Sequence, residues 1–120
     1  IPVFVDDNKN FKGIDAVIDK DLTAAKLGRV IRADEYYIVT DIDQVYLNYG
    51  KDNQTPIDTM TDEEAKQYQE EGHFQQGSMW PKSRWAIHFL KHHGKKVVIT
   101  NIDNLQDAID GKAGTSIIKK

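Results

Sequence analysis

Two short runs of β-branched and aromatic residues constrain the fold of this chain more than any other feature. Residues 36–40 (YYIVT) are a continuous β-prone run typical of a strand buried on both faces, and residues 97–100 (VVIT) are predicted to form a buried strand. Segments with helical spacing lie between them and before them. Because strands that alternate with helices imply βα crossovers, we expect an α/β fold with a largely parallel sheet and helices on both faces.

Two helices carry clear start signals. Thr61 and Glu64 form a capping box that opens a polar helix ending near residue 71. Pro81 suits the first turn of a second helix, in which Ala86, Phe89 and Leu90 share the face that we expect to point inward. Shorter elements are predicted from turn and helix signals: an N-terminal hairpin or strand–loop–strand unit, two strands and a short helix, at residues 1–18, 45–48, 115–118 and 105–110.

A further helix is predicted directly after the N-terminal extended segments. Asp19 or Asp21 can cap it. Ala24, Leu27 and Ile31 follow at helical spacing, so we expect them on its buried face.

Composition sets the class of protein. The 120 residues are 39% hydrophobic and 29% charged, which is typical of one globular domain covering residues 1–120. A net charge of −3 argues against nucleic-acid and membrane-surface partners, which need a basic face, and no apolar run approaches the ~20 residues that span a bilayer. The chain has no cysteine, which excludes disulfides and thiolate catalysis and fits a cytoplasmic protein. A start in a strand-like run without an initiator Met indicates a piece of a larger protein.

A lysine lies at the predicted start of two helices. Lys20 and Asp21 follow the extended segment that ends at residue 18, where ligands of parallel α/β sheets bind. Lys82 falls in the first turn of its helix, where the macrodipole disfavours a cation by roughly 0.3–1 kcal/mol. An anion bound beside both lysines would explain these positions. The alternatives are a helix cap with solvated charges at residues 19–21, and a Lys82 side chain that reaches away from the helix end.

Polar and aromatic residues follow the strand predicted at residues 36–40. Thr40 and Asp41 lie at its carboxyl end, where carboxylates commonly meet ribose hydroxyls, a metal or an ammonium group. An Asx turn that ends the strand is the alternative role for Asp41. Tyr46 and Tyr49 are spaced to line a flat slot for a nucleotide base, or else are half-buried strand aromatics.

The histidines give a weaker signal. His88 and His92 are four residues apart on one predicted helix, a spacing that can chelate a metal. No carboxylate completes a motif such as H-E-x-x-H, so we expect surface histidines and no metal site. His73, in a glycine-containing segment, is the histidine that we expect near a ligand. The chain contains neither the P-loop motif nor the G-x-G-x-x-G motif of Rossmann sites.

Four ordered blocks resemble the carbamate kinases of the amino-acid kinase superfamily. Residues 12–21 (KGIDAVIDKD) are similar to the family's K-G-V-E-A-V-I-D-K-D, and residues 40–51 (TDIDQVYLNYGK) to T-D-V-D-x-V-x-x-N-Y-G-K. Residues 71–82 carry E-G-H-F and G-S-M-W-P-K, which resemble the family's most specific block. Residues 111–115 match the closing G-x-x-G-T. The chain is therefore similar to the C-terminal, nucleotide-binding part of this family, the C-terminal lobe of the amino-acid kinase fold.

The resemblance implies phosphoryl transfer between ATP and carbamate, often run from carbamoyl phosphate and ADP toward ATP. It implies that Lys20 and Lys82 neutralise charge on the transferred phosphoryl group and that Asp21 orients those lysines. It also implies Mg²⁺ bridging the phosphates and a dimeric complete protein. The residues that the resemblance places around the adenosine are Thr40, Asp41, Tyr46, Tyr49, Gly50, Lys51 and Met79.

The same resemblance marks what the chain lacks. The family's N-terminal lobe carries a glycine loop for the transferred phosphate, the carbamate site and a further catalytic lysine, so we expect the isolated chain to be inactive. An absent lobe would leave an apolar face open, and we expect association with itself or with that lobe. A nucleotide-binding module without chemistry, or another amino-acid kinase of the acetylglutamate or aspartate type, are the alternatives. Trp85 replaces a small residue of the family pattern, so packing there must differ or open outward.

Overall fold

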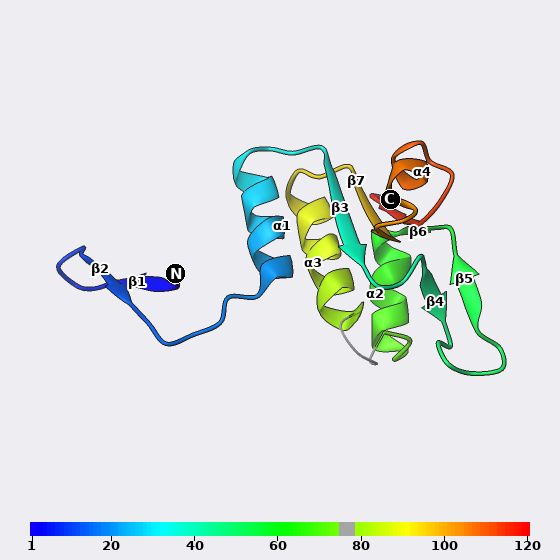
Figure 1. The fold of residues 1–120 in the computed structure, drawn as a ribbon, viewed down its shortest axis with the longest axis horizontal. Coiled ribbons are helices and arrows are strands. Elements are labelled where there is room, and N and C mark those ends of the chain that lie inside the picture. Colours follow the sequence, from blue (N-terminus) through cyan, green and yellow to red (C-terminus); the bar gives the residue numbers. More distant parts are fainter. Residues whose placement is uncertain (75–78) are drawn as a thin grey trace.

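The computed structural model describes residues 1–74 and 79–120. Strands and helices alternate along most of the chain (Figure 1). In chain order the elements are β1 (Val3–Val5), β2 (Phe11–Gly13), α1 (Lys20–Val30), β3 (Glu35–Thr40), β4 (Val45–Leu47), β5 (Thr55–Ile57), β6 (Thr59–Thr61), α2 (Asp62–Glu70), α3 (Met79–His92), β7 (Lys96–Asn101), α4 (Leu105–Ile109) and β8 (Thr115–Ile118).

The main sheet has the strand order β3-β7-β8-β6. β3 pairs in parallel with β7, and β6 pairs in parallel with β8, whereas β7 and β8 are antiparallel. Outside this sheet, β4 and β5 form an antiparallel pair, as do β1 and β2. The prediction of an α/β fold with a largely parallel sheet is confirmed, with one antiparallel pairing at its centre.

The helices cover the two faces of the sheet unequally. On one face, Val97 and Ile99 of β7 belong to the core that α3 completes. On the other face, Val98 is also fully buried, and Gly114, in the segment after α4, packs against it. The prediction that residues 97–100 form a buried strand is therefore confirmed.

The prediction that residues 36–40 form a strand buried on both faces is wrong. Ile38 is 4% exposed and faces the core, but the next residue, Val39, is 43% exposed. β3 lies at the edge of the sheet order, beyond the part of the second face that α4 and the following turn cover. Sheet order, which the local run of apolar residues does not encode, decides how many faces of a strand are buried.

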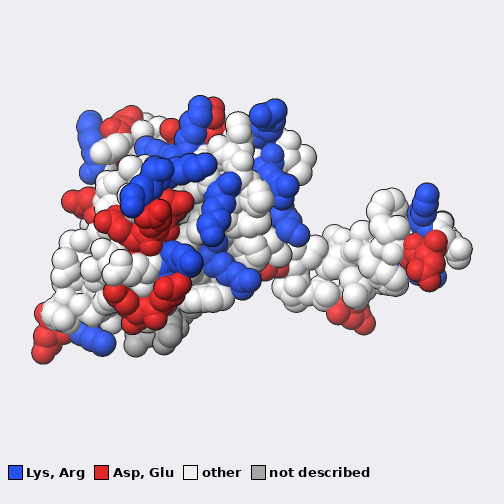
Figure 2. All heavy atoms as spheres, turned by 180° about the vertical axis from the view of Figure 1, so that it is seen from behind, with Lys and Arg blue, Asp and Glu red and all other residues white. Residues whose placement is uncertain are grey.

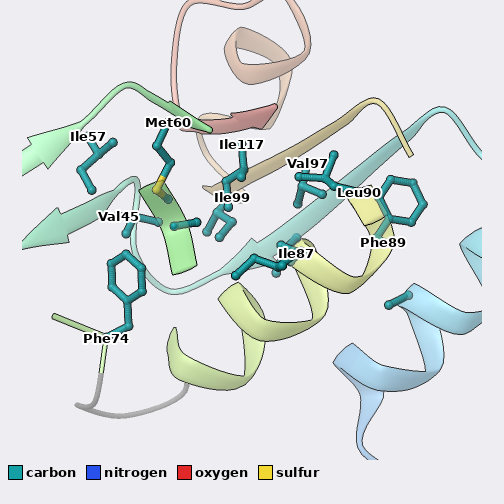
Figure 3. Close-up of a cluster of buried hydrophobic side chains, with 14 residues drawn as sticks. Val45, Ile57, Met60, Phe74, Ile87, Phe89, Leu90, Val97, Ile99 and Ile117 are labelled. Carbon is teal, nitrogen blue, oxygen red and sulfur yellow. The ribbon is translucent and has the colours of Figure 1, made fainter. Parts of the chain in front are cut away.

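The core lies between the sheet and the helices α1, α2 and α3 (Figure 3). Phe89 and Leu90 of α3 are at most 1% exposed, as is Ala86, so the predicted inward face of this helix is confirmed. Each fully buried large apolar side chain contributes roughly 1.5–3 kcal/mol to folding. Met60 of β6 and Ile117 of β8 carry the core across to the far edge of the sheet.

Helix α1 is oriented differently from the sequence prediction. Leu27 and Ile31, expected on its buried face, are 57% and 65% exposed. Ala25, at 0% exposure, lies against the core, and Gly28 lies so close to the Phe89 ring that an added Cβ would come within 2.8 Å of a ring carbon. Small residues let α1 approach α3 closely, so the helix turns its small face inward and leaves its larger apolar residues outside.

The N-terminal residues form an arm that extends away from the rest of the molecule (Figure 1). The predicted hairpin is confirmed, with Val3 opposite Gly13 in an antiparallel pair. The four apolar side chains of its strands, Val3, Phe4, Val5 and Phe11, are between 47% and 77% exposed. None of the described helices has the length and apolar character needed to cross a membrane.

Candidate functional site

The starts of α1 and α3 hold a buried ion pair. Lys82 is 3% exposed and Asp21 is 8% exposed, and the Lys82 Nζ lies 3.3 Å from the Asp21 Oδ2. Removing two charges from water is costly, and the attraction between them offsets that cost only when they stay together. A lysine held in one place under these conditions is a fixed positive charge at the end of a helix.

Local signals place both partners. Asp19 is the N-cap of α1 and accepts hydrogen bonds from the backbone N–H groups of Asp21, at 2.8 Å, and Leu22, at 3.2 Å. Of the two predicted caps, Asp19 is thus the one used. Helix α3 begins at Met79, so Lys82 is in its first turn as predicted. Asp21 supplies the negative charge that offsets the unfavourable macrodipole there.

Lys20 differs from Lys82 in burial. It is the first residue of α1, is exposed, and makes no ion pair with any residue that the structure describes. The structure therefore joins two of the three predicted catalytic residues in one contact and leaves Lys20 beside them, free to reach outward. One buried and one exposed cation beside two helix N-termini form a site suited to an anion.

The charges of Asp21 and Asp19 also act on Tyr36, a residue that no sequence pattern singled out. Its ring packs edge-on against Phe89, with centroids 5.6 Å apart. Burial, together with the negative charges of Asp21 and Asp19, raises the pKa of Tyr36 to about 12. The hydroxyl consequently stays protonated throughout the physiological range.

A hollow of about 360 Å³ lies beyond the carboxyl ends of β3 and β7. Its lining consists of Asp41, Ile42, Asp43, Tyr46, Tyr49, Gln54, Asn101 and Asn104. Three residues predicted to surround an adenosine, Asp41, Tyr46 and Tyr49, are thus brought together here. Figure 1 shows that α1 and α3 begin on the side of the sheet toward which β3 points, which is also the side of β4.

Hydrogen bonds organise the wall of this hollow. The Tyr46 hydroxyl donates to the Asp43 Oδ1 at 2.9 Å, and this bond raises the pKa of Tyr46. The rings of Tyr46 and Tyr49 lie 6.1 Å apart with a tilt of 46°. The Thr40 hydroxyl donates to the Asp41 Oδ1 at 3.1 Å, and within the described residues Asp41 makes no Asx-turn bond to a following N–H.

The sequence prediction missed the amide side chains of this hollow. Asn101 ends β7 directly beside Thr40, its partner in the parallel register. Its Oδ1 accepts a hydrogen bond from the backbone N–H of Asn104 at 2.9 Å. Asn101 directly follows the apolar run at residues 97–100, just as Asp41 directly follows the run at residues 36–40, so the sequence signal for the two residues is the same. Gln54 carried none, because its place depends on the pairing of β4 with β5.

A smaller hollow of about 110 Å³ lies on the other side of Tyr49 and is lined by Asn48, Tyr49, Lys51, Glu71, Gly72 and His73. The His73 Nδ1 accepts from the Asn48 N–H at 3.3 Å, and the His73 Nε2 lies 3.4 Å from a Glu71 carboxylate oxygen. An Nδ1 that accepts leaves the proton on Nε2, facing Glu71. His73 thus lies beside two residues predicted to bind nucleotide, Tyr49 and Lys51.

Gly50 and Met79 complete the predicted set. Gly50 has φ of +76° in the turn after β4, a conformation that suits glycine, and its N–H donates to the Gln54 Oε1 at 2.8 Å. Met79 packs against the hydrophobic core at the start of α3 and lines neither hollow. The structure therefore does not bring Met79 together with the other predicted residues. Gly77 and Ser78 of the same sequence block lie outside the described residues.

Thr115 fixes the β4–β5 pair, whose strand β4 carries Tyr46 and precedes the turn that holds Tyr49. It is fully buried in β8, where its hydroxyl oxygen accepts from the Val45 N–H at 2.8 Å and its O–H donates to the Ile57 carbonyl at 2.5 Å. One side chain therefore satisfies a backbone group in each of β4 and β5. This contact attaches the β4–β5 pair, and with it the wall of the larger hollow, to the main sheet.

The remaining histidine prediction concerns α3. The rings of His88 and His92 lie 4.4 Å apart, centroid to centroid. Within residues 1–74 and 79–120 there is no group of three or more His, Cys, Asp or Glu side chains placed to hold a metal ion.

Comparison with known proteins gives one consistent result. Residues 1–101 match the model of the amino acid kinase family. The chain is 47% identical, over 99% of its length, to a carbamate kinase of Thermoplasma acidophilum and 40% identical, over its whole length, to one of Thermococcus kodakarensis. These matches cover 39% and 38% of the two relatives, so the chain spans about two fifths of their length. A solved carbamate kinase from Giardia lamblia bound to AMP-PNP superimposes with a TM-score of 0.90 at 39% identity, over 95% of this chain and 40% of that one.

Proposed function

The chain belongs to the amino acid kinase family, and from this premise we propose that it forms the nucleotide-binding part of a carbamate kinase. Such an enzyme transfers a phosphoryl group between ATP and carbamate and also runs from carbamoyl phosphate and ADP to ATP. The buried Lys82–Asp21 pair at the start of two helices is the observation that carries the proposal. Support comes from the relatives, which are carbamate kinases, one of them solved with an ATP analogue.

Lys82 and Lys20 act on the transferred phosphoryl group in this proposal. Catalysis of phosphoryl transfer consists mainly of positioning and of stabilising charge on the equatorial oxygens. Lys82 is suited to this because its ammonium group is already desolvated and fixed by Asp21, so little reorganisation is needed when the phosphate arrives. Lys20 is exposed and closes on the phosphate from solvent. Asp21 positions Lys82 and prevents it from turning away.

The larger hollow receives the adenosine. Tyr49 and Tyr46 offer aromatic faces to the base, and Asp41, bonded to Thr40, offers carboxylate oxygen to ribose hydroxyls. Lys51 lines the smaller hollow, and Gly50, in the turn before it, donates its N–H to Gln54 of the larger hollow. Met79 contacts the nucleotide only if the start of α3 adjusts on binding, because it is packed in the core here.

Magnesium enters this proposal with the nucleotide. Mg²⁺ takes oxygen ligands, keeps several waters and needs only one or two carboxylates besides the phosphates. Asp43, on the wall of the hollow, has that chemistry and would hold the ion. When bound, the ion supplies neutralising charge to the phosphates.

The remaining parts of the reaction belong to the portion of the relatives that this chain does not span. We place there the carbamate site, a glycine loop for the transferred phosphate and a further lysine, and we expect the complete protein to be a dimer. A nucleotide-binding piece without catalysis is the second candidate. It is favoured by the same fact, since the proposed nucleotide residues lie on this chain while only about two fifths of the relatives' length is matched.

An ATP-forming assay with carbamoyl phosphate and ADP on the protein at its natural length tests this function. We expect ATP formation, and we expect Lys82→Met to lower turnover by roughly 10²–10³-fold or more with a smaller effect on nucleotide affinity. Unchanged turnover in the variant would remove Lys82 from the mechanism. Retained ADP binding without ATP formation in the unaltered protein would establish the second candidate instead.

A further inference from the structure

A separate groove of about 270 Å³ lies between α2 and α3. It is lined by Lys66, Gln69, Arg84, Trp85, Ile87, His88 and Lys91. Arg84, His88 and Lys91 are spaced four and three residues apart, so they form one stripe along α3. The groove shares no residue with the two hollows beside Tyr49.

The two walls of the groove are joined rigidly. The side-chain amide of Gln69, on α2, donates to the Ser83 hydroxyl at 2.8 Å and to the Trp80 carbonyl at 3.1 Å. Ser83 is 1% exposed, so this link lies at the packed base of the groove. A groove whose walls are joined by hydrogen bonds between α2 and α3 is formed without a ligand, which lowers the cost of binding.

Arg84 is held in place by two indole rings. Its guanidinium carbon lies 5.2 Å from the centroid of Trp80 and 5.2 Å from that of Trp85. Cation–π contacts of this kind fix the guanidinium plane while leaving its N–H donors available. The sequence predicts that packing at Trp85 differs from the family pattern or opens outward. Trp85 is in fact half-buried and forms part of the groove wall.

Three cationic side chains, Lys66, Arg84 and Lys91, line this groove, and its lining includes no carboxylate. Lys66 has only a loose contact with Glu70, at 3.7 Å, in which both side chains are more than 60% exposed. Among the described residues, no carboxylate lies within ion-pair distance of Arg84 or Lys91. Figure 2 shows Lys and Arg side chains on the part of the body next to the arm, and Asp and Glu side chains gathered farther from it, on a chain whose net charge is −3.

The pKa of His88 reflects its burial and the positive charges around the groove. Its pKa is lowered first by burial and then by the charges of His92, Arg29, Lys26 and Lys91. Arg29 and Lys26 belong to α1, so positive groups face the imidazole from that helix as well as from its own. Lys66 of α2 lines the same groove. Positive groups from three helices thus favour a bound anion here and disfavour protonation of His88.

We propose that this groove is a second anion site, which binds a small molecule carrying phosphate groups and is separate from the nucleotide hollow. Its volume is below the range of roughly 300–1,000 Å³ typical of drug-sized ligands, so it fits a phosphate or pyrophosphate group better than a whole nucleotide. Arg84 presents the planar donors that suit bidentate phosphate contacts, and Lys66 and Lys91 add point charges on either side.

The test follows the imidazole signals of His88 by NMR as inorganic pyrophosphate is added to the full chain at constant ionic strength. A bound anion favours the imidazolium, so we expect saturable shifts and a rise of the His88 pKa by roughly 0.5–1 unit. The variant Lys82→Met should respond in the same way, because its substitution lies in the other site. The Lys82→Met measurement therefore separates this proposal from the nucleotide function. If the nucleotide function fails, the His88 response to pyrophosphate should remain.

A matched pair of variants decides the location. Arg84→Gln with Lys91→Gln should weaken pyrophosphate binding roughly tenfold, the loss expected for two partly exposed charged contacts. Lys112→Gln with Lys119→Gln removes the same charge from exposed positions elsewhere and should leave binding unchanged. Equal weakening in both pairs, a response reproduced by sodium chloride at the same ionic strength, or no saturable His88 shift would overturn the proposal.

Discussion

The two clusters that we assign to one nucleotide site are built in different ways. At the starts of α1 and α3, Lys82 and Asp21 are buried and depend on each other. At the ends of β3 and β7, the hollow is open, and residues such as Tyr49, which is 48% exposed, contact solvent. A buried charge pair leaves a large penalty when one partner is lost, whereas exposed groups are replaced by water. Substitutions at the first cluster should therefore affect folding and chemistry together, and those at the second should affect ligand affinity alone.

Removing the negative partner of the buried pair should have the largest effect on stability. Asp21→Asn leaves the Lys82 charge buried without a counter-charge, and we expect a loss of about 3 kcal/mol in the free energy of unfolding. Urea unfolding followed by circular dichroism measures this. The double variant Asp21→Asn/Lys82→Met removes both charges and should recover more than half of the loss. Strictly additive losses would mean that the two side chains do not stabilise each other.

Thr115 attaches the β4–β5 pair, which forms part of the wall of the larger hollow, to the main sheet. Thr115→Val keeps the shape but leaves the Val45 N–H and the Ile57 carbonyl without their partner, which should cost about 1–3 kcal/mol. Thr115→Ser retains both hydrogen bonds and should lose less. The comparison predicts that Thr115→Val also weakens nucleotide binding, since it loosens the wall that holds the tyrosines, and that Thr115→Ser restores the affinity. Calorimetric titration with ADP gives this readout, and a Thr115→Val protein with full affinity would show that the link does not position the hollow.

Tyr49 tests the open cluster. Tyr49→Ala should weaken ADP binding roughly tenfold, because stacking of a base on an aromatic ring is worth about 1–3 kcal/mol. Its side chain is 48% exposed, so the midpoint of urea unfolding should barely move. Tyr37→Ala serves as the control, since Tyr37 lies on β3 and lines neither hollow. A destabilised Tyr49→Ala protein with unchanged affinity would reverse the roles that we give to the two clusters.

The smallest effect concerns His88, whose pKa is lowered by burial and by the positive groups around it. The pKa of His88 in the folded chain lies below its ordinary value of 6.5, so the unfolded state binds the proton more tightly. Stability contributed by the neutral imidazole is thus complete above pH 6.5 and is lost as the pH falls below it. We expect His88→Gln to reduce the difference in unfolding midpoint between pH 8 and pH 5, measured in urea. An unaltered difference would mean that burial and the positive groups around His88 do not lower its pKa enough to affect stability.

Sequence patterns predicted the parts of this fold that depend on neighbouring residues. The capping box is present with both of its hydrogen bonds, 3.1 Å from the Glu64 N–H to the Thr61 hydroxyl and 2.8 Å from the Thr61 N–H to the Glu64 carboxylate. The inward face of α3 and the cap at Asp19 follow equally local rules. Each of these features is set by side chains within one or two helical turns.

Features that depend on residues far apart in the chain could not be predicted from sequence patterns. The orientation of α1 depends on the contact of Gly28 with Phe89, which no helical periodicity encodes. The exposure of Val39 depends on β3 lying at the sheet edge. In the site, the sequence placed Asp21 and Lys82 at helix starts, but their pairing across 61 residues is a product of how α1 and α3 pack.

The assignment of both clusters to one nucleotide is tested most directly by comparing the affinities of ADP and adenosine for the unaltered protein and two variants. Lys82→Met should weaken ADP binding several-fold and leave adenosine binding unchanged, because it removes a charge that only phosphate meets. Tyr49→Ala should weaken both ligands by a similar factor, roughly tenfold. If Lys82→Met weakens ADP and adenosine equally, or if Tyr49→Ala affects neither, the two clusters are not the phosphate and base ends of one site.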